Sequence, residues 1–469
     1  MRSNVKEKKA LIYTHEGAVA VFVDPIHQLR RSVLATLLFE AQFYEEGQSI
    51  ADRIHAEVAE VLKQKNGAQK VADVAIEARS KMKLRHVPLW LIVALVKAGT
   101  EATRAVVADT IAAVIQRPDE LGELVALYWK DKKHPLTAQM KKGLRTAFQK
   151  FDAYSLAKYN GDGAAIKLRD VMFLTHAKPK DQEQAEVWKK LADKTLESPD
   201  TWEVALSSGA DKKATFTRLI NEKKLGALAL LRNLRNMQTA GVDEGVIRQG
   251  LATMKVERVL PFRFITAAKY APRMEKELEG AMLRCLSDHE RLTGKTVLIV
   301  DCSGSMTSQL SEKSELIRLE AAAALAMLLR EVCEEVSIYA TAGNDSSRIH
   351  ATTLVPSRNG FALRDLLSYD QTNRKIGGGG IFLKQVMDYV RTEEKGEADR
   401  IIVITDEQDC DLVNKPSSAK PFGENNYLIN VASYRNGIGY GEWVHIDGWS
   451  ENALSYIQQY ERSSAQENV

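Results

Sequence analysis

Residues 296–306 read TVLIVDCSGSM, and this stretch decides the fold of the second half of the chain. The continuous apolar run Thr296–Val300 predicts a strand that is buried on both faces. The run ends in Asp301-Cys302-Ser303-Gly304-Ser305, where a loop can direct one carboxylate and two hydroxyls to one point. Hard divalent cations prefer such oxygen ligands. The alternative is that Asp301 and the two serines only cap the following helix.

Helices and strands alternate from this loop onward. The sequence predicts helices over 316–333, 381–391 and 452–460, and strands over 336–340, 400–405, 427–432 and 443–446. This alternation is typical of a mostly parallel, doubly wound α/β sheet. In such sheets ligands bind at the carboxyl ends of the strands, where Asp301 and Asp406 both fall. We therefore expect Asp406 to join Asp301, Ser303 and Ser305 at a metal site.

The first 294 residues show another pattern, in which one short helix follows the next. Apolar residues with helical spacing are separated by breaks such as Arg117-Pro118-Asp119 and Ser198-Pro199-Asp200. The main strand candidate is a short extended piece around Ala18–Val23. No strict sequence period repeats, so we expect a degenerate, all-α HEAT-like array in place of a regular TPR or ankyrin array. The expected domains are residues 1–294, all-α, and 295–469, α/β.

The charge divides at the same boundary. The chain of 469 residues has 65 Lys and Arg against 62 Asp and Glu, a net charge of +3. Residues 1–294 hold 48 of the basic and 37 of the acidic residues, a net charge of +11, which leaves −8 for residues 295–469. A basic helical array is typical of proteins that bind a phosphate backbone, and the alternative is two ordinary domains with different surfaces. The basic residues form clusters along the array: Arg79, Lys81, Lys83 and Arg85; Lys130, Lys132 and Lys133; Lys141, Lys142 and Arg145; Lys212 and Lys213; Lys223 and Lys224; Arg232 and Arg235.

Three features of the sequence limit the cellular setting. The longest apolar run, Val87–Val96, is shorter than the ~20 residues that a membrane-spanning helix needs. The charged N-terminus is followed by no signal-peptide core. The four cysteines form no Cys-x-x-Cys pair. We therefore expect a cytoplasmic protein with reduced thiols and no membrane partner.

Several of these motifs resemble a known family. Asp301–Met306 and Ile404–Asp406 resemble the metal-ion-dependent adhesion site of von Willebrand factor A domains. Upstream stretches resemble, in order, the TROVE module of the Ro autoantigen family in its bacterial form: His15–Ala18, Leu168–Pro179, Leu228–Met237 and Arg258–Phe264. The resemblance covers nearly the whole chain. It implies that the helical module closes into a ring whose ends are bridged by the A domain.

The resemblance also implies a function. Ro family members bind small noncoding Y RNAs on the outer surface of the ring and single-stranded 3′ ends of misfolded RNAs in its central hole. Bacterial relatives are associated with RNA decay and maturation, including a tether through Y RNA to the exonuclease polynucleotide phosphorylase. The implied protein is a monomeric RNA-binding protein and not an enzyme.

For the RNA site, the resemblance implies three residues. Lys158, Arg169 and His176 stand at positions that resemble Y RNA contacts. A further basic contact of the family falls near Asp162, where this chain has no Arg. Considered alone, His176 is also typical of a histidine at a helix end.

For the metal site, the resemblance implies Mg²⁺ bound by Asp301, Ser303, Ser305 and Asp406. The Thr that family A domains usually add as a ligand falls near Gly379, which has no side-chain oxygen. We therefore expect an ion that is held weakly, with more water in its coordination shell.

A second function of a different class stays open. In this alternative the chain is a protein-interaction scaffold, in which the A domain docks an acidic partner residue through its metal and the helices act as a platform. A hydrolase ranks third, because no paired catalytic carboxylates or nucleophile–base motif stand out in the sequence.

Overall fold

A computed structural model describes residues 11–20, 23–34, 47–160, 163–257, 259, 262–286, 290–310, 314–368, 376, 378–414, 419–432, 434, 436–439, 441–448 and 452–467. Several predicted features fall wholly or partly outside these residues. Asp162 does so entirely, as do two residues of the Ala18–Val23 piece and three of Arg258–Phe264.

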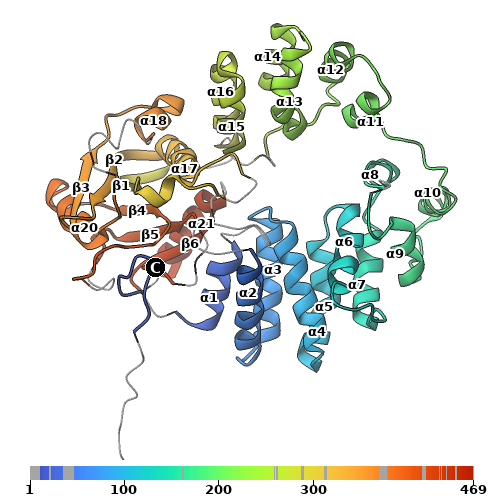
Figure 1. Ribbon diagram of the computed structural model, residues 1–469, viewed down its shortest axis with the longest axis horizontal. Helices are drawn as coiled ribbons and strands as arrows, with labels where there is room; N and C mark the ends of the chain where they lie inside the picture. Colours follow the sequence, from blue (N-terminus) through green and yellow to red (C-terminus); the bar gives the residue numbers. More distant parts are fainter. Residues whose placement is uncertain are drawn as a thin grey trace, which may run out of the picture.

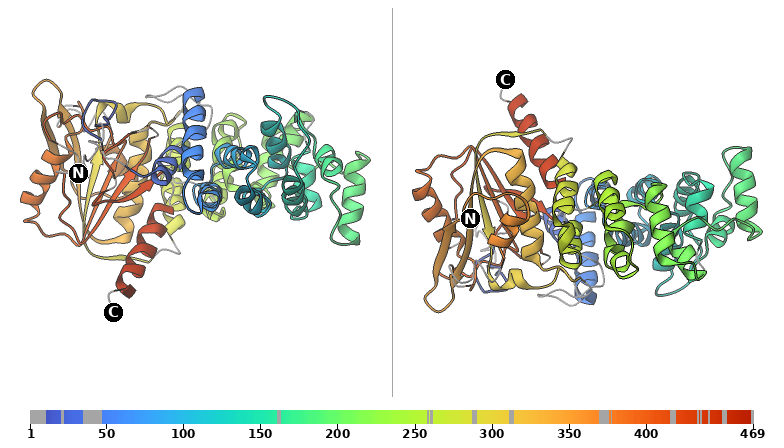
Figure 2. Two further views of the ribbon diagram at one scale, coloured as in Figure 1. Left: turned by 90° about the horizontal axis from the view of Figure 1, so that it is seen from below. Right: turned by 90° about the horizontal axis from the view of Figure 1, so that it is seen from above.

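Helices follow one another through the N-terminal part of the chain, as predicted. They are α1 (Pro25–Leu34), α2 (Gly47–Leu62), α3 (Gly67–Ser80), α4 (His86–Ala98), α5 (Glu101–Val114), α6 (Pro118–Tyr128), α7 (Ala138–Phe148), α8 (Ala153–Lys158), α9 (Leu168–Thr175), α10 (Gln182–Ala192), α11 (Trp202–Ser207), α12 (Lys212–Asn221), α13 (Ala227–Thr239), α14 (Glu244–Thr253), α15 (Phe262–Tyr270) and α16 (Glu275–Leu283), with short 3₁₀ turns η1 (Pro272–Met274) and η2 (Arg284–Leu286). They curve into an arc whose two ends meet the α/β part, so that the molecule is a ring (Figure 1). Views along the edge show the helices side by side in a row (Figure 2).

Local sequence explains where these helices begin. Thr100, Thr137 and Thr201 each precede a helix and accept a hydrogen bond from a backbone N–H of its first turn. Asp152 and Asp243 do the same for α8 and α14. Such caps satisfy N–H groups that have no partner inside the helix.

The apolar run Val87–Val96 forms α4 at the centre of the helical core. Leu91 and Leu95 are fully buried there. Among the described residues, no helix is long and apolar enough to cross a membrane.

The second half of the chain forms the predicted sheet. Its strands are β1 (Leu292–Asp301), β2 (Cys333–Asn344), β3 (Ile349–Leu354), β4 (Arg400–Thr405), β5 (Asn425–Asn430) and β6 (Val444–Asp447), in the order β3-β2-β1-β4-β5-β6. All neighbouring strands are parallel except β2 and β3. The antiparallel edge strand β3 was not predicted, because its half-exposed residues form no buried apolar run.

Helices cover both faces of this sheet, which makes it doubly wound (Figure 1). On one face, Leu298 and Val300 of β1 share a core with α17 (Arg318–Val332) and α21 (Asn452–Glu467). On the other face, Val297 and Ile299 pack with α20 (Leu383–Glu393). The alternation follows from the two-residue period of a strand. It explains why the stretch Val297–Val300 of β1 is apolar at every residue.

The hydrophobic core is shared across the predicted boundary at Gly294. Helices α12–α16 contribute to one continuous core with α17 and a face of the sheet, whereas α1–α10 pack around a core of their own. Gly294 itself lies within β1. The division into residues 1–294 and 295–469 stays a prediction.

One end of the helical arc therefore joins the α/β part through apolar packing. Polar contacts flank this joint: Glu279 of α16 accepts a hydrogen bond from the backbone N–H of Phe361, at 2.8 Å, at the start of α18 (Gly360–Leu366). Arg364 of α18 pairs with Glu275 of α16 at 2.9 Å.

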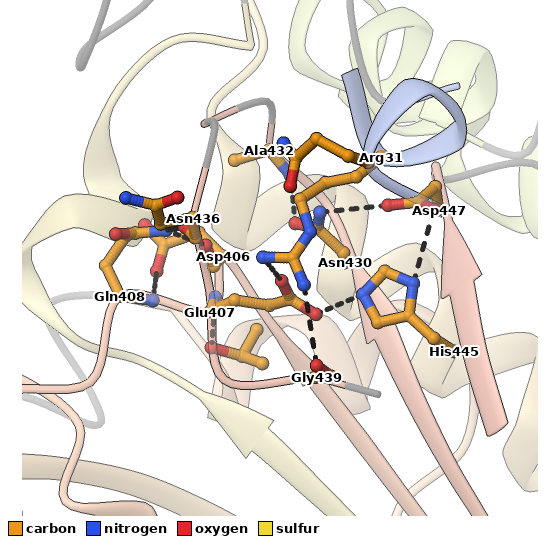
Figure 3. A network of polar contacts seen from close by, with 12 residues as sticks. Arg31, Asp406, Glu407, Gln408, Asn430, Ala432, Asn436, Gly439, His445 and Asp447 are labelled. Atoms are coloured by element: carbon orange, nitrogen blue, oxygen red, sulfur yellow. Dashed lines mark hydrogen bonds and ion pairs between the residues drawn. The ribbon is translucent and has the colours of Figure 1, made fainter. Parts of the chain in front are cut away.

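The other end of the arc closes on the α/β part through buried charges. Arg31 of α1 lies 2.7 Å from Glu407, which follows β4. Glu407 also contacts His445 of β6, and the second ring nitrogen of His445 lies 3.2 Å from Asp447 (Figure 3). Segments from the two ends of the chain thus meet in one network of ion pairs, which completes the ring. We call this network of Arg31, Glu407, His445 and Asp447 the polar joint.

Residues before α1 extend this polar joint. The hydroxyl of Thr14 donates to the backbone carbonyl of Asp409 at 3.0 Å, and the backbone N–H of His15 donates to the side chain of Gln408 at 2.7 Å. The motif His15–Ala18 therefore lies against the loop that follows β4.

Candidate functional site

The DxSxS loop forms at the carboxyl end of the central strand, as the sequence predicted. Asp301 is the last residue of β1 and is fully buried. One of its carboxylate oxygens accepts a hydrogen bond from the backbone N–H of Ser303 at 2.8 Å. The hydroxyls of Ser303 and Ser305 lie 3.2 Å apart. Ser303 precedes the 3₁₀ turn η3 (Gly304–Thr307), but its side chain makes no capping hydrogen bond, so the geometry does not support the capping interpretation.

The neighbouring strand β4 brings a second carboxylate to this loop. Strands β1 and β4 are paired in parallel, with Val300 opposite Ile404. The hydroxyl of Thr405 donates to the other carboxylate oxygen of Asp301 at 2.6 Å, a contact that the sequence reasoning missed. Burial raises the pKa of Asp301 well above its usual range, and the nearby charge of Asp406 adds to this rise.

Asp406 has a positively charged partner inside the protein. Its carboxylate lies 2.9 Å from a guanidinium nitrogen of Arg318, and both side chains are almost fully buried. Arg318 is the first residue of α17, the helix that follows the DxSxS loop. The sequence analysis did not single out Arg318, because no spacing rule links it to Asp406.

Gly379, near which the resemblance places the missing Thr, lies beside the loop. Gly379 accepts a hydrogen bond from the backbone N–H of Gly304 at 3.1 Å and donates to the carbonyl of Gly343 at 2.8 Å. A Cβ atom added to Gly379 would lie 2.6 Å from the Gly343 carbonyl oxygen and 2.8 Å from a carboxylate oxygen of Asp345. A side chain at this position therefore requires the backbone to move.

The residues of this loop fit a weakly held divalent cation. Asp301, Ser303, Ser305 and Asp406 supply carboxylate and hydroxyl oxygens, the donors that Mg²⁺ prefers. The set contains only two carboxylates, and no cluster of three or more His, Cys, Asp or Glu suited to a metal occurs among the described residues. Mg²⁺ at this site stays a prediction.

Two of the three predicted RNA-binding residues belong to α9 or directly follow it. Arg169 lies in the first turn of α9 and His176 directly follows the helix. They therefore stand near opposite ends of α9. His176 caps α9 with φ 52° and is exposed, so the structure places it at a helix end as its local sequence indicated. Lys158 is exposed at the end of α8.

An exposed aromatic residue lies between Arg169 and His176, and the sequence reasoning missed it. Phe173 is 55% exposed, and the guanidinium of Arg169 lies 5.9 Å from the centre of its ring. Its position four residues after Arg169 puts it on the same face of α9. That spacing was the signal that could have found it.

Some residues of the basic clusters already form ion pairs with acidic residues of the helical array. Arg79 is buried and pairs with Glu120 at 2.7 Å. Arg85 pairs with Asp119 at 3.0 Å, and Lys224 pairs with Asp200 at 3.2 Å. These three residues stabilise contacts between neighbouring helices or turns, so they are already engaged with carboxylates of the array.

Comparisons with known proteins agree with this geometry. The TROVE domain family model matches residues 189–351, which run from α10 into β3. The crystal structure of the Deinococcus radiodurans RO (RSR) protein has a similar fold, with a TM-score of 0.57 and 17% sequence identity over 93% of this chain and 98% of that chain. Telomerase protein component 1 from Rattus norvegicus and from Mus musculus are each 33% identical over 91 residues, or 18% of this chain. This chain covers only 4% of the length of those two relatives.

Fold and site together define a class of protein: a ring in which a helical array is closed by an α/β domain with a DxSxS loop. Residues 189–351 match the TROVE domain family, and the chain shares its fold with the Deinococcus radiodurans RO (RSR) protein, so both comparisons agree with the resemblance that the motifs indicated.

Proposed function

We propose that this protein is a noncoding-RNA-binding ring protein and not an enzyme. The observation that carries this proposal is the TROVE domain match within a chain that has the fold of a Ro protein over nearly its whole length. The RNA would be a small Y-like RNA on the outer basic surface. Single-stranded 3′ ends of misfolded RNAs would enter the centre of the ring. The protein would then act in RNA quality control, decay or maturation with an exonuclease, of which polynucleotide phosphorylase is our candidate.

Exposed residues of α8 and α9 support an RNA site in this part of the ring. Lys158 and His176 are exposed, and Arg169 is half-buried beside Phe173. Cations bind phosphate oxygens without reading the sequence, and an exposed aromatic ring can stack on an unpaired base. This combination suits a folded RNA that has both a duplex and unpaired nucleotides.

The cysteines support a reducing compartment. All four, Cys285, Cys302, Cys333 and Cys410, are free thiols, although Cys302 and Cys333 are buried in the α/β core. Disulfides form and persist in oxidising environments. We therefore propose that the protein is cytoplasmic and, from the family resemblance, that it acts as a monomer.

We also propose that the DxSxS loop takes Mg²⁺. Asp301, Ser303, Ser305 and Asp406 would hold the ion, which would supply positive charge for an acidic group of a partner. Three contacts support this proposal: the backbone N–H of Ser303 donates to Asp301, the hydroxyls of Ser303 and Ser305 lie 3.2 Å apart, and Thr405, next to Asp406, donates to Asp301.

The RNA proposal is tested by fluorescence anisotropy with a labelled Y-like hairpin RNA at a series of salt concentrations. We expect a submicromolar dissociation constant that rises steeply with salt, because phosphate contacts release counterions. The triple variant K158A/R169A/H176A should bind more weakly and lose roughly one unit of salt slope for each cation removed. The control K212A/K213A removes two exposed lysines of α12, and it should retain most of the affinity.

Two outcomes would contradict the proposal. Absent or salt-insensitive RNA binding would reject RNA as the partner. Unchanged binding by the triple variant would reject the α8–α9 site. A pull-down before and after RNase treatment separates RNA binding from the scaffold alternative, because a scaffold would keep its protein partners after the RNA is destroyed.

A further inference from the structure

The starting point is the position of Arg318 next to the proposed metal site. Its backbone N–H donates to the carbonyl of Ser308 at 2.9 Å, which ties the start of α17 to the loop that follows Ser305. The backbone of Leu310 is likewise hydrogen-bonded to Leu316 at 2.9 Å. The guanidinium is therefore anchored through its own helix to the same loop that carries the metal-ligand hydroxyls.

The contact of Arg318 with Asp406 is a buried ion pair. The nitrogen–oxygen distance is 2.9 Å, and the two side chains are 1% and 0% exposed. The guanidinium of Arg318 therefore places a positive charge directly beside this carboxylate. Each member of a buried pair is costly to leave unpaired, and the contact is therefore expected to persist in the metal-free protein.

This fixed charge opposes a second cation at the same carboxylate. A divalent ion that approaches Asp406 meets the guanidinium within a few ångströms, and like charges repel most strongly where water is excluded. Gly379, beside the loop, has no side-chain oxygen to add as a ligand, and a larger residue there would collide with Gly343 and Asp345. Repulsion by the guanidinium and the missing oxygen ligand both lower the affinity of the DxSxS site for a divalent cation.

We propose that Arg318 is the resident counter-ion of Asp406 and that Mg²⁺ enters the DxSxS site only in competition with it. The inference rests on the proposed metal site and adds the residue that sets its affinity. In the metal-free protein Arg318 neutralises Asp406. When Mg²⁺ binds, the guanidinium has to move away from the carboxylate.

The test compares Mg²⁺ binding by wild type, R318Q and R318K, measured by isothermal titration calorimetry and by the shift of melting temperature with added Mg²⁺. R318Q keeps a hydrogen-bond donor but removes the charge, so we expect it to bind Mg²⁺ at least about tenfold more tightly than wild type. R318K keeps the charge and should resemble wild type. The variant R318Q/S303A/S305A should lose the gain, which locates the ion at the DxSxS loop.

The outcomes separate this inference from the metal site itself. Measurable and equal affinities of folded R318Q and wild type would overturn the role of Arg318 and leave the metal site standing. Absence of Mg²⁺ binding in both folded proteins would overturn the metal site and this inference together. If R318Q folds only when Mg²⁺ is present, the ion has replaced the lost charge, and the inference is supported.

A second measurement covers the case in which R318Q does not fold at all. Crystals of the wild-type protein soaked in Mn²⁺ are examined for anomalous density beside Asp301 and Asp406. An ion with the Arg318 side chain moved away from Asp406 would support the competition. An ion with Arg318 still in contact with Asp406, or no ion at all, would overturn it.

Discussion

A guanidinium nitrogen of Arg31 lies 2.7 Å from a carboxylate oxygen of Glu407, and each side chain is only 1% exposed. Arg31 belongs to the first helix of the ring, and Glu407 follows β4 of the α/β domain. The guanidinium also donates to the backbone carbonyl of Gly439 at 3.5 Å (Figure 3). This pair joins the two ends of the chain, so the polar joint of the ring depends on it.

The first prediction concerns the variant R31M. It leaves the buried carboxylate of Glu407 without its guanidinium, so we expect a loss of about 3–5 kcal/mol in the free energy of unfolding. Urea denaturation measures the loss, and faster hydrogen exchange in α1 would locate it at the joint. The control R30M removes a neighbouring pair with Glu77 whose side chains are 29% and 20% exposed, and it should cost about 1 kcal/mol or less. Equal stability of R31M and wild type would contradict the prediction.

The second prediction concerns pH at the same joint. Burial lowers the pKa of His445, but the charges of Asp447 and Glu407 outweigh it and raise the pKa to about 8. Arg31 also faces this cluster through Glu407. Because the folded-state pKa is raised, the stabilisation is complete below the ordinary value of about 6.5 and is lost as pH rises through about 8.

The loss should reach roughly 2 kcal/mol between pH 6 and 9, since one pKa unit corresponds to about 1.4 kcal/mol. Melting temperature and hydrogen exchange of α1, measured across this range, test it. The variant H445Q has no titrating group here and should show a flatter profile. A wild-type profile as flat as that of H445Q would show that folding does not raise the pKa of His445.

The third prediction concerns Gly439, which lies against Glu407 and His445 of the polar joint and leaves no room for a side chain. A Cβ atom on Gly439 would collide with the carboxylate of Glu407 and the ring of His445. G439A should therefore cost about 1–3 kcal/mol through overpacking. The matched control is G280A, at an exposed position of α16 where an added Cβ meets nothing within 4 Å. Alanine there should be neutral or stabilising by up to about 1 kcal/mol. Thermal unfolding that ranks the two variants in the opposite order would contradict the prediction.

The fourth prediction concerns Phe173 on α9. We expect F173A to weaken binding of an RNA with unpaired bases by about 1–3 kcal/mol, because a base loses its stacking partner. The salt slope should not change, since Phe173 carries no charge. Anisotropy titrations of a bulged hairpin and of a blunt duplex measure the difference. F173Y, which keeps an aromatic ring, serves as the control. Equal losses for the two RNAs would argue against stacking.

Much of the fold follows from local patterns in the sequence. The run Thr296–Val300 is apolar at every residue after Thr296, and it forms the central strand because such a run must be covered on both faces. Asp301 and Asp406 come together because parallel neighbouring strands end at the same edge of the sheet. The edge strand β3 escaped prediction, because a half-exposed strand needs no apolar run.

The sequence by itself determined the order of helices and strands apart from β3, the DxSxS loop and the family resemblance, because each depends on residues that are close together in the chain. Only the tertiary structure decided which charges meet. Arg318 and Asp406 are brought together by the packing of α17 against β1 and the pairing of β1 with β4, and Arg31 and Glu407 by closure of the ring. The structure also showed that the core of α12–α16 continues into the sheet. Such pairings depend on how whole elements pack, and the spacing of residues along the chain carries no signal for them.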